Sequence, residues 1–547
     1  MLRLFVRSSS QRMMMPLAQP PRCQQAGFNL MGAFMRVVLG NGASVVRARW
    51  KLVRAAWLLL MSLVWGAAAM AQAFGHEHGG QGSPHTSYRV INLGPGTIAA
   101  YPHINATGQV AFSTVSGGRA AGFFYDGTVV RNIGSLGGAN VYVAGLNDAS
   151  QVAGTSLNEH GIENAFVWSA GGGMLGIRSG AGGGRSYGLA INSHGVVTGS
   201  FSQAPDGPAR PFRWSVAGGA EDLGLAPGLP WPSAGRVLND AGLIAGVATI
   251  DDEQTHAFAW TRSGGTVAID TRGSVESTPV AVGAAGEVAG NRLASFEDGG
   301  DRPFLWTRAG GMVDLGTGRG TTAWVNAMTP GLHIAGGIGY ADGRQRAMSW
   351  TRRGGMRELG TLGGRTSVAR DVNARGQIVG FAEDRAGAMR AFVWSADGGM
   401  LDLNRALRRA PPGLVLDHAL SINDSGVIVA SSNAGLVLLR PGGAQGDGHL
   451  GHVLGPVVAP ASVTVGARLE ARIGFLDDDG TGTRSVNWSW GDGSARQAGK
   501  LRETGGIGTA SASHGYAAPG VYELVVTVVD RDGRSTAVSH RVEVTES

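Results

Sequence analysis

The most regular stretch of this 547-residue sequence reads VNARGQIVG at residues 372–380, AFVW at residues 391–394 and GGMLDL at residues 398–403. Related stretches recur along the chain in the form Ile/Val-Asn-x-x-Gly-x-Val/Ile-x-Gly, a spacer, Ala-Phe-x-Trp, Gly-Gly and Asp-Leu-Gly. The aromatic anchor of eight copies falls at steps of 43 to 46 residues, at Tyr125, Trp168, Trp214, Trp260, Trp306, Trp350, Trp394 and Leu438. A period of this length indicates that each copy is one structural unit.

Each phrase of the repeat predicts a local structure. Asn-x-x-Gly between two β-rich runs predicts a hairpin turn, because the Asn side chain stabilises the turn and Gly adopts the positive φ that closes it. Two rings spaced two residues apart point to one face of a strand, where they fill the space between neighbouring sheets. One unit therefore contains four short strands: before Asn, after Gly, around Phe-x-Trp and around Asp-Leu-Gly. The Asn position is assigned to Asn105, Asn147, Asn192, Asn239, Gly283, Met328, Asn373 and Asn423.

This pattern predicts an all-β chain in which residues 88–440 form a β-propeller of eight four-stranded blades. The ends of the region favour a closed ring. Residues 88–94 resemble a lone Asp-Leu-Gly strand, and the last copy has no such strand after it, so the first strand is expected to complete the last blade. Two alternatives stay open: a β-helix, whose coils are shorter, and a ring of seven blades that leaves out a degenerate terminal copy.

The composition fits this prediction. Glycine accounts for 91 of the 547 residues, which argues against a helical protein. Hydrophobic residues make up 43% of the chain and charged residues only 16%, so the chain can bury a sizeable core.

The repeat resembles the HAF repeat of bacterial extracellular proteins, which is named for a His-Ala-Phe that stands here at residues 256–258. The resemblance covers residues 88–440. It implies export and a propeller-like repeat, and it brings no catalytic residues because that family is defined by the repeat itself.

The pattern changes after the repeats. Residues 441–455 are rich in Gly and predict a linker, whereas residues 456–547 contain about seven short alternating strands, which predict an immunoglobulin-like β-sandwich. The stretches WSWGDGS at 488–494, HGY at 514–516 and PGVY at 519–522 closely resemble the PKD domain. That resemblance implies a Trp core, a Gly-Asp-Gly turn and a role as a spacer or substrate-contacting module.

Residues 1–73 predict an N-terminal extension and an export signal. They carry nine basic residues and no acidic one, and the uncharged run AAWLLLMSLVWGAAAM follows at residues 55–70. A positive segment, an apolar run and small residues before a cleavage site are typical of a signal peptide, whereas a spanning helix needs about 20 apolar residues. We expect cleavage after Ala73 or Ala71, with an uncleaved membrane anchor as the alternative. Residues 74–87 then form a flexible tether.

The positions of the cysteine and of three histidines limit the catalytic and metal sites that the mature chain can form. Cys23 is the only cysteine and lies in the segment expected to be removed, so the mature chain has no thiol for catalysis, metal binding or a disulfide. His76, His78 and His85 lie in the tether, where we expect solvated side chains and no metal site.

The formal charge of +6 comes from the N-terminal extension. The rest of the chain holds 37 of the 46 basic residues and all 40 acidic ones. Without a basic surface nothing attracts a phosphate backbone, so we expect no nucleic-acid partner.

The sequence is interpreted as containing no Gly-x-Ser-x-Gly nucleophile elbow, His-Glu-x-x-His zinc motif, Walker loop or paired-Cys motif. Asp222, Asp314 and Asp402 recur at one repeat position, which favours a structural role. The remaining candidates are carboxylates of the variable loops and scattered histidines. They are Asp251, Asp252, Glu253, Asp298, Asp301, His160, His194 and His333.

The sandwich contains four aspartates that could supply oxygens to Ca²⁺. They are Asp477, Asp478, Asp479 and Asp492. Acidic turns in solvent are the simpler interpretation, so we assign no metal site to them.

These features predict a secreted or cell-surface protein, with the periplasm as an alternative location, that binds through propeller loops without catalysis. The expected partner is an extracellular glycan or a surface protein, and no membrane span is expected in the mature chain. We assign no catalytic, cofactor-binding or metal-ligating residue and no cofactor. The alternatives are a propeller hydrolase or lyase acting on extracellular polysaccharide, and a structural role in envelope or matrix assembly.

Overall fold

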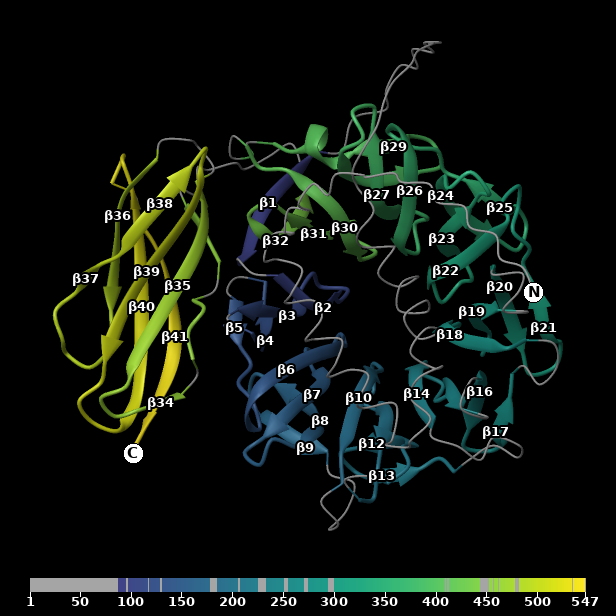
Figure 1. Cartoon of the computed structure of the whole chain (residues 1–547), viewed down its shortest axis with the longest axis horizontal. Helices are drawn as coiled ribbons and strands as arrows, with labels where there is room; N and C mark the ends of the chain where they lie inside the picture. The colour runs from purple at the N-terminus through teal and green to yellow at the C-terminus, as the bar shows by residue number, and fades with distance from the viewer. Residues whose placement is uncertain are drawn as a thin grey trace, which may run out of the picture. The chain divides into compact units, whose positions relative to one another are not determined.

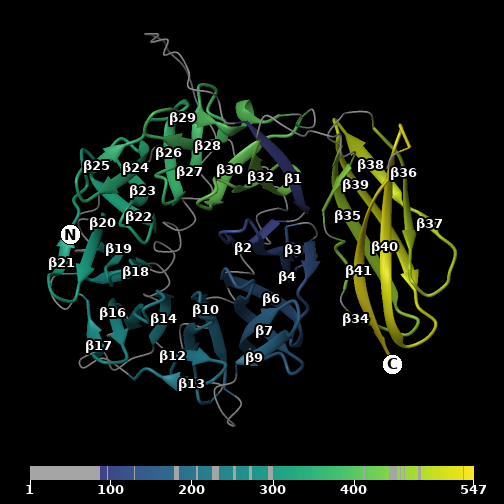
Figure 2. The same ribbon diagram turned by 180° about the vertical axis from the view of Figure 1, so that it is seen from behind.

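The protein is all-β, as the sequence predicts. The computed structural model describes residues 87–442 and 452–546, with gaps at 95–96, 117, 128–129, 178–183, 205–206, 225–232, 250–253, 270–273, 294–299, 409, 411–412, 456, 461, 478–481 and 534. Within these residues the only helix is η1, a 3-10 turn at Leu403–Ala406, and the strands form many small sheets (Figures 1 and 2). The expected signal peptide, Cys23 and the tether histidines lie outside the described residues.

The strands of the repeat region form eight units of four antiparallel strands. One parallel residue pair joins unit 4 to unit 5, and another joins unit 6 to unit 7. Unit 1 contains β2 (Thr97–Ile104), β3 (Val110–Ser116), β4 (Arg119–Tyr125) and β5 (Val130–Asn132). Unit 2 contains β6 (Gly137–Leu146), β7 (Val152–Asn158), β8 (Glu163–Ser169) and β9 (Gly173–Ile177). Unit 3 contains β10 (Ser186–Ile191), β11 (Val197–Phe201), β12 (Arg210–Ser215) and β13 (Gly219–Asp222). Unit 4 contains β14 (Ser233–Leu238), β15 (Ile244–Thr249), β16 (Thr255–Thr261) and β17 (Gly265–Ala268).

The later units repeat this order. Unit 5 contains β18 (Glu276–Val282), β19 (Val288–Leu293), β20 (Asp301–Thr307) and β21 (Gly311–Asp314). Unit 6 contains β22 (Thr322–Met328), β23 (Ile334–Gly339), β24 (Gln345–Thr351) and β25 (Gly355–Glu358). Unit 7 contains β26 (Gly363–Val372), β27 (Ile378–Asp384), β28 (Met389–Ser395) and β29 (Gly399–Asp402). Unit 8 contains β30 (Leu416–Ile422), β31 (Ile428–Ser432), β32 (Gly435–Pro441) and, from the start of the region, β1 (Tyr88–Gly94).

The turn between the first two strands of a unit is the predicted hairpin. In unit 7 the amide of Asn373 donates to the carbonyl of Gln377 (3.0 Å), and the amide of Gly376 donates to the carbonyl of Asn373 (2.9 Å). Gly376 has a φ of 75°, the left-handed conformation that favours glycine. The Asn373 side chain accepts from the amide of Gln377 (2.9 Å) and so stabilises its own turn.

Two predicted repeat positions were wrong by one residue. In unit 6 the amide of Thr329 donates to the carbonyl of His333, so Thr329 and not Met328 occupies the Asn position. In unit 8 Leu439, and not Leu438, occupies the anchor position, because it pairs with the first residue of β31 as Trp394 does with the first residue of β27. Both copies have lost the residue type that marks the position.

A β-bulge in the first strand explains why glycine recurs at one position of the second strand. In unit 7 the register of β26 against β27 shifts between Ala369 and Asp371, which brings the carbonyl of Val368 towards Gly380. A Cβ added at Gly380 would lie 2.0 Å from that oxygen. The equivalent glycines of units 2 to 6 would meet a first-strand carbonyl oxygen at 1.8 to 2.3 Å; they are Gly154, Gly199, Gly246, Gly290 and Gly336. Glycine therefore stands opposite this bulge in units 2 to 7, whereas unit 8 has Ala430 there.

The Phe-x-Trp rings pack between neighbouring units, as predicted. Phe392 and Trp394 of unit 7 pack against Ala335 and Ala347 of unit 6. The residues between them on β28 face the other way, where Val393 packs against unit 8. Alternate residues of β28 thus contact the preceding and the following unit.

The repeat asparagines also link the units by hydrogen bonds. Asn373 Nδ2 donates to the carbonyl of Asn423 (2.9 Å), and Asn423 Nδ2 donates to the carbonyl of Asn105 at the far end of the repeat region (2.9 Å). The same bond joins Asn105 to Asn147, Asn147 to Asn192, Asn192 to Asn239 and Asn239 to Gly283. It is missing where Gly283 and Thr329 replace Asn.

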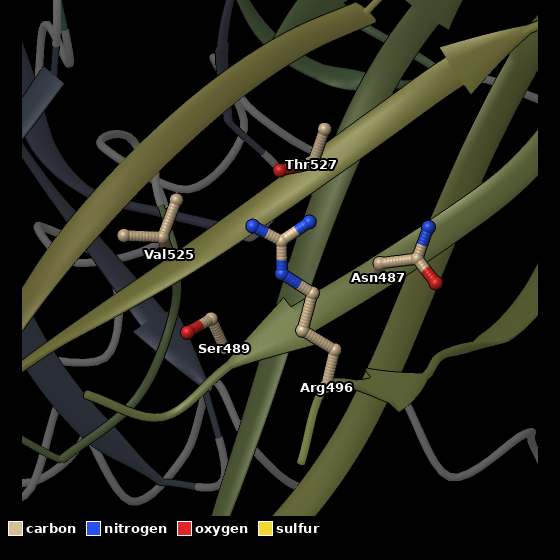
Figure 3. Close-up of a pocket in the computed structure, with 5 residues that line it drawn as sticks. All are labelled: Asn487, Ser489, Arg496, Val525 and Thr527. Carbon is tan, nitrogen blue, oxygen red and sulfur yellow. The ribbon is translucent and has the colours of Figure 1, made fainter. Parts of the chain in front are cut away.

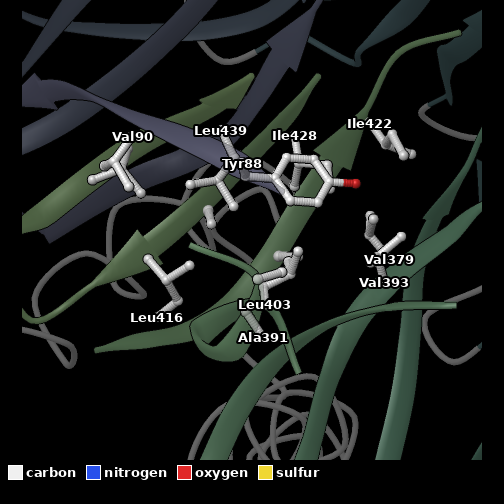
Figure 4. Packing of buried hydrophobic residues seen from close by; sticks show 14 of the residues in the cluster. Tyr88, Val90, Val379, Ala391, Val393, Leu403, Leu416, Ile422, Ile428 and Leu439 are labelled. Carbon is white, nitrogen blue, oxygen red and sulfur yellow. The ribbon is translucent and has the colours of Figure 1, made fainter. Parts of the chain in front are cut away.

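Strand β1 joins the two ends of the repeat region, as the sequence predicts. It pairs antiparallel with β32 from Tyr88 opposite Pro441 to Gly94 opposite Leu436. Tyr88 is only 1% exposed and packs with residues of units 7 and 8 (Figure 4). Burial raises the pKa of Tyr88 to about 12.

The C-terminal region is an immunoglobulin-like sandwich of two sheets. One sheet contains, in order, β33 (His452–Leu454), β35 (Arg468–Asp477), β39 (Ile507–Gly515) and β38 (Lys500–Thr504). The other contains β34 (Ser462–Thr464), β41 (Ser535–Thr545), β40 (Gly520–Asp530), β36 (Thr483–Ser489) and β37 (Gln497–Ala498). Trp488 and Trp490 are buried in the core between them.

Asp492 belongs to a structural network at one end of this core. His514 Nε2 lies 2.6 Å from Asp492 Oδ2, and its ring stacks on Trp490 at 4.9 Å between centroids. Burial alone would raise the pKa of Asp492, but hydrogen bonds from Ser494 and His514 outweigh it and lower the pKa to about 2.

We predict that Gly380→Ala lowers the free energy of unfolding by about 1–3 kcal/mol, because the new Cβ forces the bulge apart. Gly171→Ala is the control, since Gly171 is exposed and a Cβ there meets no atom within 4 Å. Urea unfolding monitored by circular dichroism measures both. Equal effects of the two substitutions would contradict the bulge as the reason for glycine.

We also predict that the hydrogen-bonded carboxylate of Asp492 stabilises the sandwich in a pH-dependent way. Because its pKa is lower in the folded chain than its ordinary 3.8, the stabilisation is complete above about pH 4 and is lost as the pH falls through about 2. The difference in unfolding free energy between the unaltered protein and Asp492→Asn should therefore shrink from pH 6 to pH 2. A constant difference in urea titrations across that range would refute it.

Candidate functional site

The recurring aspartates shape turns. Asp222 Oδ1 accepts from the amide of Gly224 (2.9 Å), and Asp314 Oδ1 accepts from the amide of Gly316 (2.7 Å). Asp402 Oδ1 accepts from the amide two residues later and caps η1. This is the structural role that the repeat position predicts.

One of the loop carboxylates has a carboxylate neighbour. Asp251, Asp252, Glu253 and Asp298 lie outside the described residues. Asp301 begins β20 and Glu276 begins β18, and both pair with Leu293 of β19. Burial raises the pKa of Asp301, and burial together with the charge of Asp301 raises the pKa of Glu276. Sequence analysis missed Glu276 because only the strand register brings it near Asp301.

The candidate histidines lie in different units and do not form a site. His160 is exposed beside Glu159 at 3.5 Å, and His194 lies 4.0 Å from Asp240. His333 Nε2 lies 2.7 Å from Ser349 Oγ, and burial lowers the pKa of His333.

The interpretation that the sequence contains no nucleophile-elbow motif was wrong, because residues 184–188 read GRSYG and match Gly-x-Ser-x-Gly. Ser186 is buried, donates to the carbonyl of Ile177 (2.6 Å) and accepts from the amide of Ala165 (2.9 Å). Its hydroxyl holds β10 in place and is not presented to a substrate.

The aspartates of the sandwich form no cation site among the described residues. Asp477 is buried and accepts from the amide of Gly482 (2.7 Å), and Asp492 is paired with His514. Asp478 and Asp479 lie outside the described part of the chain. Within that part, no three His, Cys, Asp or Glu residues are placed to hold a metal ion.

Five side chains from units 1, 7 and 8 form what we call the Tyr101 cluster: Tyr101 of β2, Arg370 of β26, Phe381 of β27, and Asp417 and His418 of β30. The Cζ atom of Arg370 lies 5.6 Å from the centre of the Tyr101 ring and 5.2 Å from that of Phe381. The Phe381 and His418 ring centroids are 4.5 Å apart. Cationic and aromatic groups from three units therefore meet at one place.

The cluster offers both an apolar surface and unused hydrogen-bonding groups. Tyr101 is 50% exposed, which is unusual for a large hydrophobic side chain in this fold. The Nε atom of Arg370 is buried and has no hydrogen-bond partner among the described residues. Such a donor is costly to leave unpaired unless a ligand or water completes it.

Asp417 orients the histidine. Its Oδ1 lies 3.2 Å from His418 Nδ1 and accepts from the hydroxyl of Ser431. Burial alone would raise the pKa of Asp417, but hydrogen bonds from His418 and Ser431 outweigh it and lower the pKa. Because Ser431 bonds the carboxylate and not the imidazole, the three residues lack the hydroxyl–imidazole bond of a nucleophilic triad.

The strand that carries Arg370 is fixed to the next unit. Asp371 accepts from the hydroxyl of Ser421 (2.9 Å) and the amide of Ile422 (2.8 Å), both in β30. Burial raises the pKa of Asp371. This tie holds Arg370 and His418 at a constant spacing, as a preformed binding site requires.

Sequence analysis missed the Tyr101 cluster. None of its residues belongs to the repeat phrase, and they come from opposite ends of the repeat region. An exposed aromatic outside the periodic anchor positions was the one available signal, and it identifies Tyr101 alone.

One part of the chain matches a known protein family. Residues 455–545 match the PKD domain family, as the WSWGDGS stretch predicts. The sequence matches no curated protein. Among the described residues, no helix has the length and apolar character needed to cross a bilayer.

Distant likenesses to solved structures accompany that match. TolB from Acinetobacter baumannii is 10% identical over 46% of this chain and 62% of its own, with a TM-score of 0.30, so this chain spans less than two thirds of that protein. The extracellular domain of a hybrid two-component system from B. thetaiotaomicron is 11% identical over 82% of this chain and 72% of its own, with a TM-score of 0.19. A mutant of AofleA from Arthrobotrys oligospora is 10% identical over 59% and 92%, with a TM-score of 0.28. What this chain shares with a known family is therefore its PKD domain.

Proposed function

We propose that the eight units are the blades of a β-propeller and that the protein is an exported, non-catalytic binding protein whose propeller recognises a glycan. The cyclic order of the units supports the propeller, since unit 8 is completed by β1 and bonded through Asn423 to unit 1. The PKD domain supports a location outside the cytoplasm, where it serves as a spacer or contact module.

The Tyr101 cluster carries the proposal. The exposed ring of Tyr101 provides a flat apolar surface for the C–H face of a pyranose. The guanidinium of Arg370 lies over this ring and holds its orientation. The guanidinium of Arg370 and the oriented ring of His418 supply hydrogen bonds to sugar hydroxyls. A few polar groups around an aromatic surface favour binding over chemistry.

A polysaccharide hydrolase is the second candidate, and Glu276 with Asp301 is the observation that favours it. Glycoside hydrolysis uses two carboxyl groups, one of them an acid with a raised pKa. Glu276 is the candidate for this acid, because burial and the charge of Asp301 raise its pKa. The same incubation that measures binding separates the two functions, because a hydrolase releases soluble sugar.

We predict that the purified protein co-sediments with at least one member of a panel of insoluble polysaccharides and that Tyr101→Ala weakens this binding about tenfold or more, since the stacking surface is lost. Tyr101→Phe keeps the ring and should bind nearly as well. Leu175→Ala removes an equally exposed apolar side chain from β9 and should bind normally.

Assay of the supernatant for reducing sugar decides between the two candidates. Binding without release agrees with the proposal. Release that disappears in Glu276→Gln would overturn it in favour of the hydrolase. Normal binding by Tyr101→Ala would remove the Tyr101 cluster as the glycan site.

A further inference from the structure

A pocket of about 140 Å³ lies on the outer face of the sandwich sheet that contains β36 and β40 (Figure 3). Its lining residues are Asn487, Ser489, Arg496, Val525 and Thr527. Asn487 pairs with Thr527 and Ser489 with Val525 across the two strands, so these four side chains form a floor. Their neighbours on the same strands, Trp488 among them, point into the core.

Arg496 forms the roof of the pocket. It immediately precedes β37, where the side chain of Gln497 accepts from Trp490 Nε1 (3.1 Å). Gln497 is thereby turned towards the core tryptophan, and Figure 3 shows the guanidinium of Arg496 extended over the floor between Ser489 and Thr527. The local structure therefore aims a positive charge at the pocket.

The charge of Arg496 is not neutralised by the protein. Among the described residues, the guanidinium makes no hydrogen bond or ion pair, and no Asp or Glu lines the pocket. The hydroxyls of Ser489 and Thr527 likewise have no partner there, and Asn487 makes only a long hydrogen bond to Ser485 (3.4 Å). The pocket thus presents several unused donors around one cation.

We propose that this pocket binds the carboxylate-bearing sugar unit of an acidic polysaccharide. Arginine donates two parallel hydrogen bonds to a carboxylate, while the amide and hydroxyls of the floor suit the ring hydroxyls of a sugar. Val525 gives the floor an apolar patch, and the volume suits one monosaccharide ring. The site is separate from the Tyr101 cluster, and the proposal does not depend on the propeller binding a glycan.

The test compares two polymers that share one sugar backbone and differ in whether the carboxyl group is ionised or methyl-esterified. Polygalacturonate carries a carboxylate on each sugar, whereas its fully methyl-esterified form does not. We expect the full-length protein to bind polygalacturonate in affinity electrophoresis or calorimetry, and to lose at least tenfold in affinity for the methyl ester.

The variants are chosen to separate a pocket from general charge. Arg496→Gln should weaken polygalacturonate binding about tenfold, and Arg496→Lys should restore it only in part, since lysine lacks the planar fork. Arg502→Gln removes the same charge from β38 on the other sheet and should have no effect. Tyr101→Ala should retain binding to this polymer through the pocket.

Three results would overturn the proposal. They are equal affinity for the charged and esterified polymers, equal losses in the Arg496 and Arg502 variants, and equal affinity of Arg496→Lys and the unaltered protein for polygalacturonate. If Tyr101→Ala abolishes polygalacturonate binding while Arg496→Gln leaves it intact, the propeller proposal stands and the pocket proposal fails. Circular dichroism of each variant verifies that the fold is unchanged.

Discussion

The pairing of β1 with β32 is the interaction on which the repeat region depends. Each unit buries both faces of its sheet, so every unit needs a neighbour on either side. A linear row of such units would leave the first and last faces exposed to water. By giving its first strand to the last unit, the chain turns the row into a cycle, and Val429 and Leu438 of unit 8 then pack against Phe112 and Phe123 of unit 1. The entropic cost of bringing the two ends of so long a segment together rises only slowly with its length. The free energy gained by burying these apolar side chains therefore outweighs that cost.

The hydrogen bonds of the repeat asparagines also hold neighbouring units together, and each depends on a single residue of the repeat. A side chain that only closed its own turn would need no particular neighbour. Asn373 closes its turn with Oδ1 and reaches the next turn with Nδ2, so one residue fixes both hairpin and spacing. The buried amide is fully bonded in both roles, which a Thr or Gly cannot reproduce. Where these replace Asn, at Thr329 and Gly283, packing of the flanking sheets maintains the cycle.

The sequence was sufficient for the strands, turns and closing strand, because each follows from a short-range rule. Asn373 and Gly376 specify a hairpin, Phe392 and Trp394 specify a doubly buried strand, and the missing strand of the last copy specifies its partner. The rules failed where the marker residue was lost, at Met328 and Leu438. The candidate sites depend on register between strands and on contacts between distant units, and no local pattern encodes that Glu276 lies near Asp301 or Arg370 beside Tyr101.

Closure also places the candidate glycan site. Tyr101 lies on the strand that follows β1, and β1 is held within unit 8 by its pairing with β32. Tyr101 is thereby brought to Arg370 of unit 7 and to His418 of unit 8, although these residues come from the other end of the repeat region. The Tyr101 cluster is thus a property of the closed cycle and not of any single repeat. A repeat protein whose units share one folding pattern can still build a distinct site, because closure brings together positions outside the repeat phrase from its first and last units.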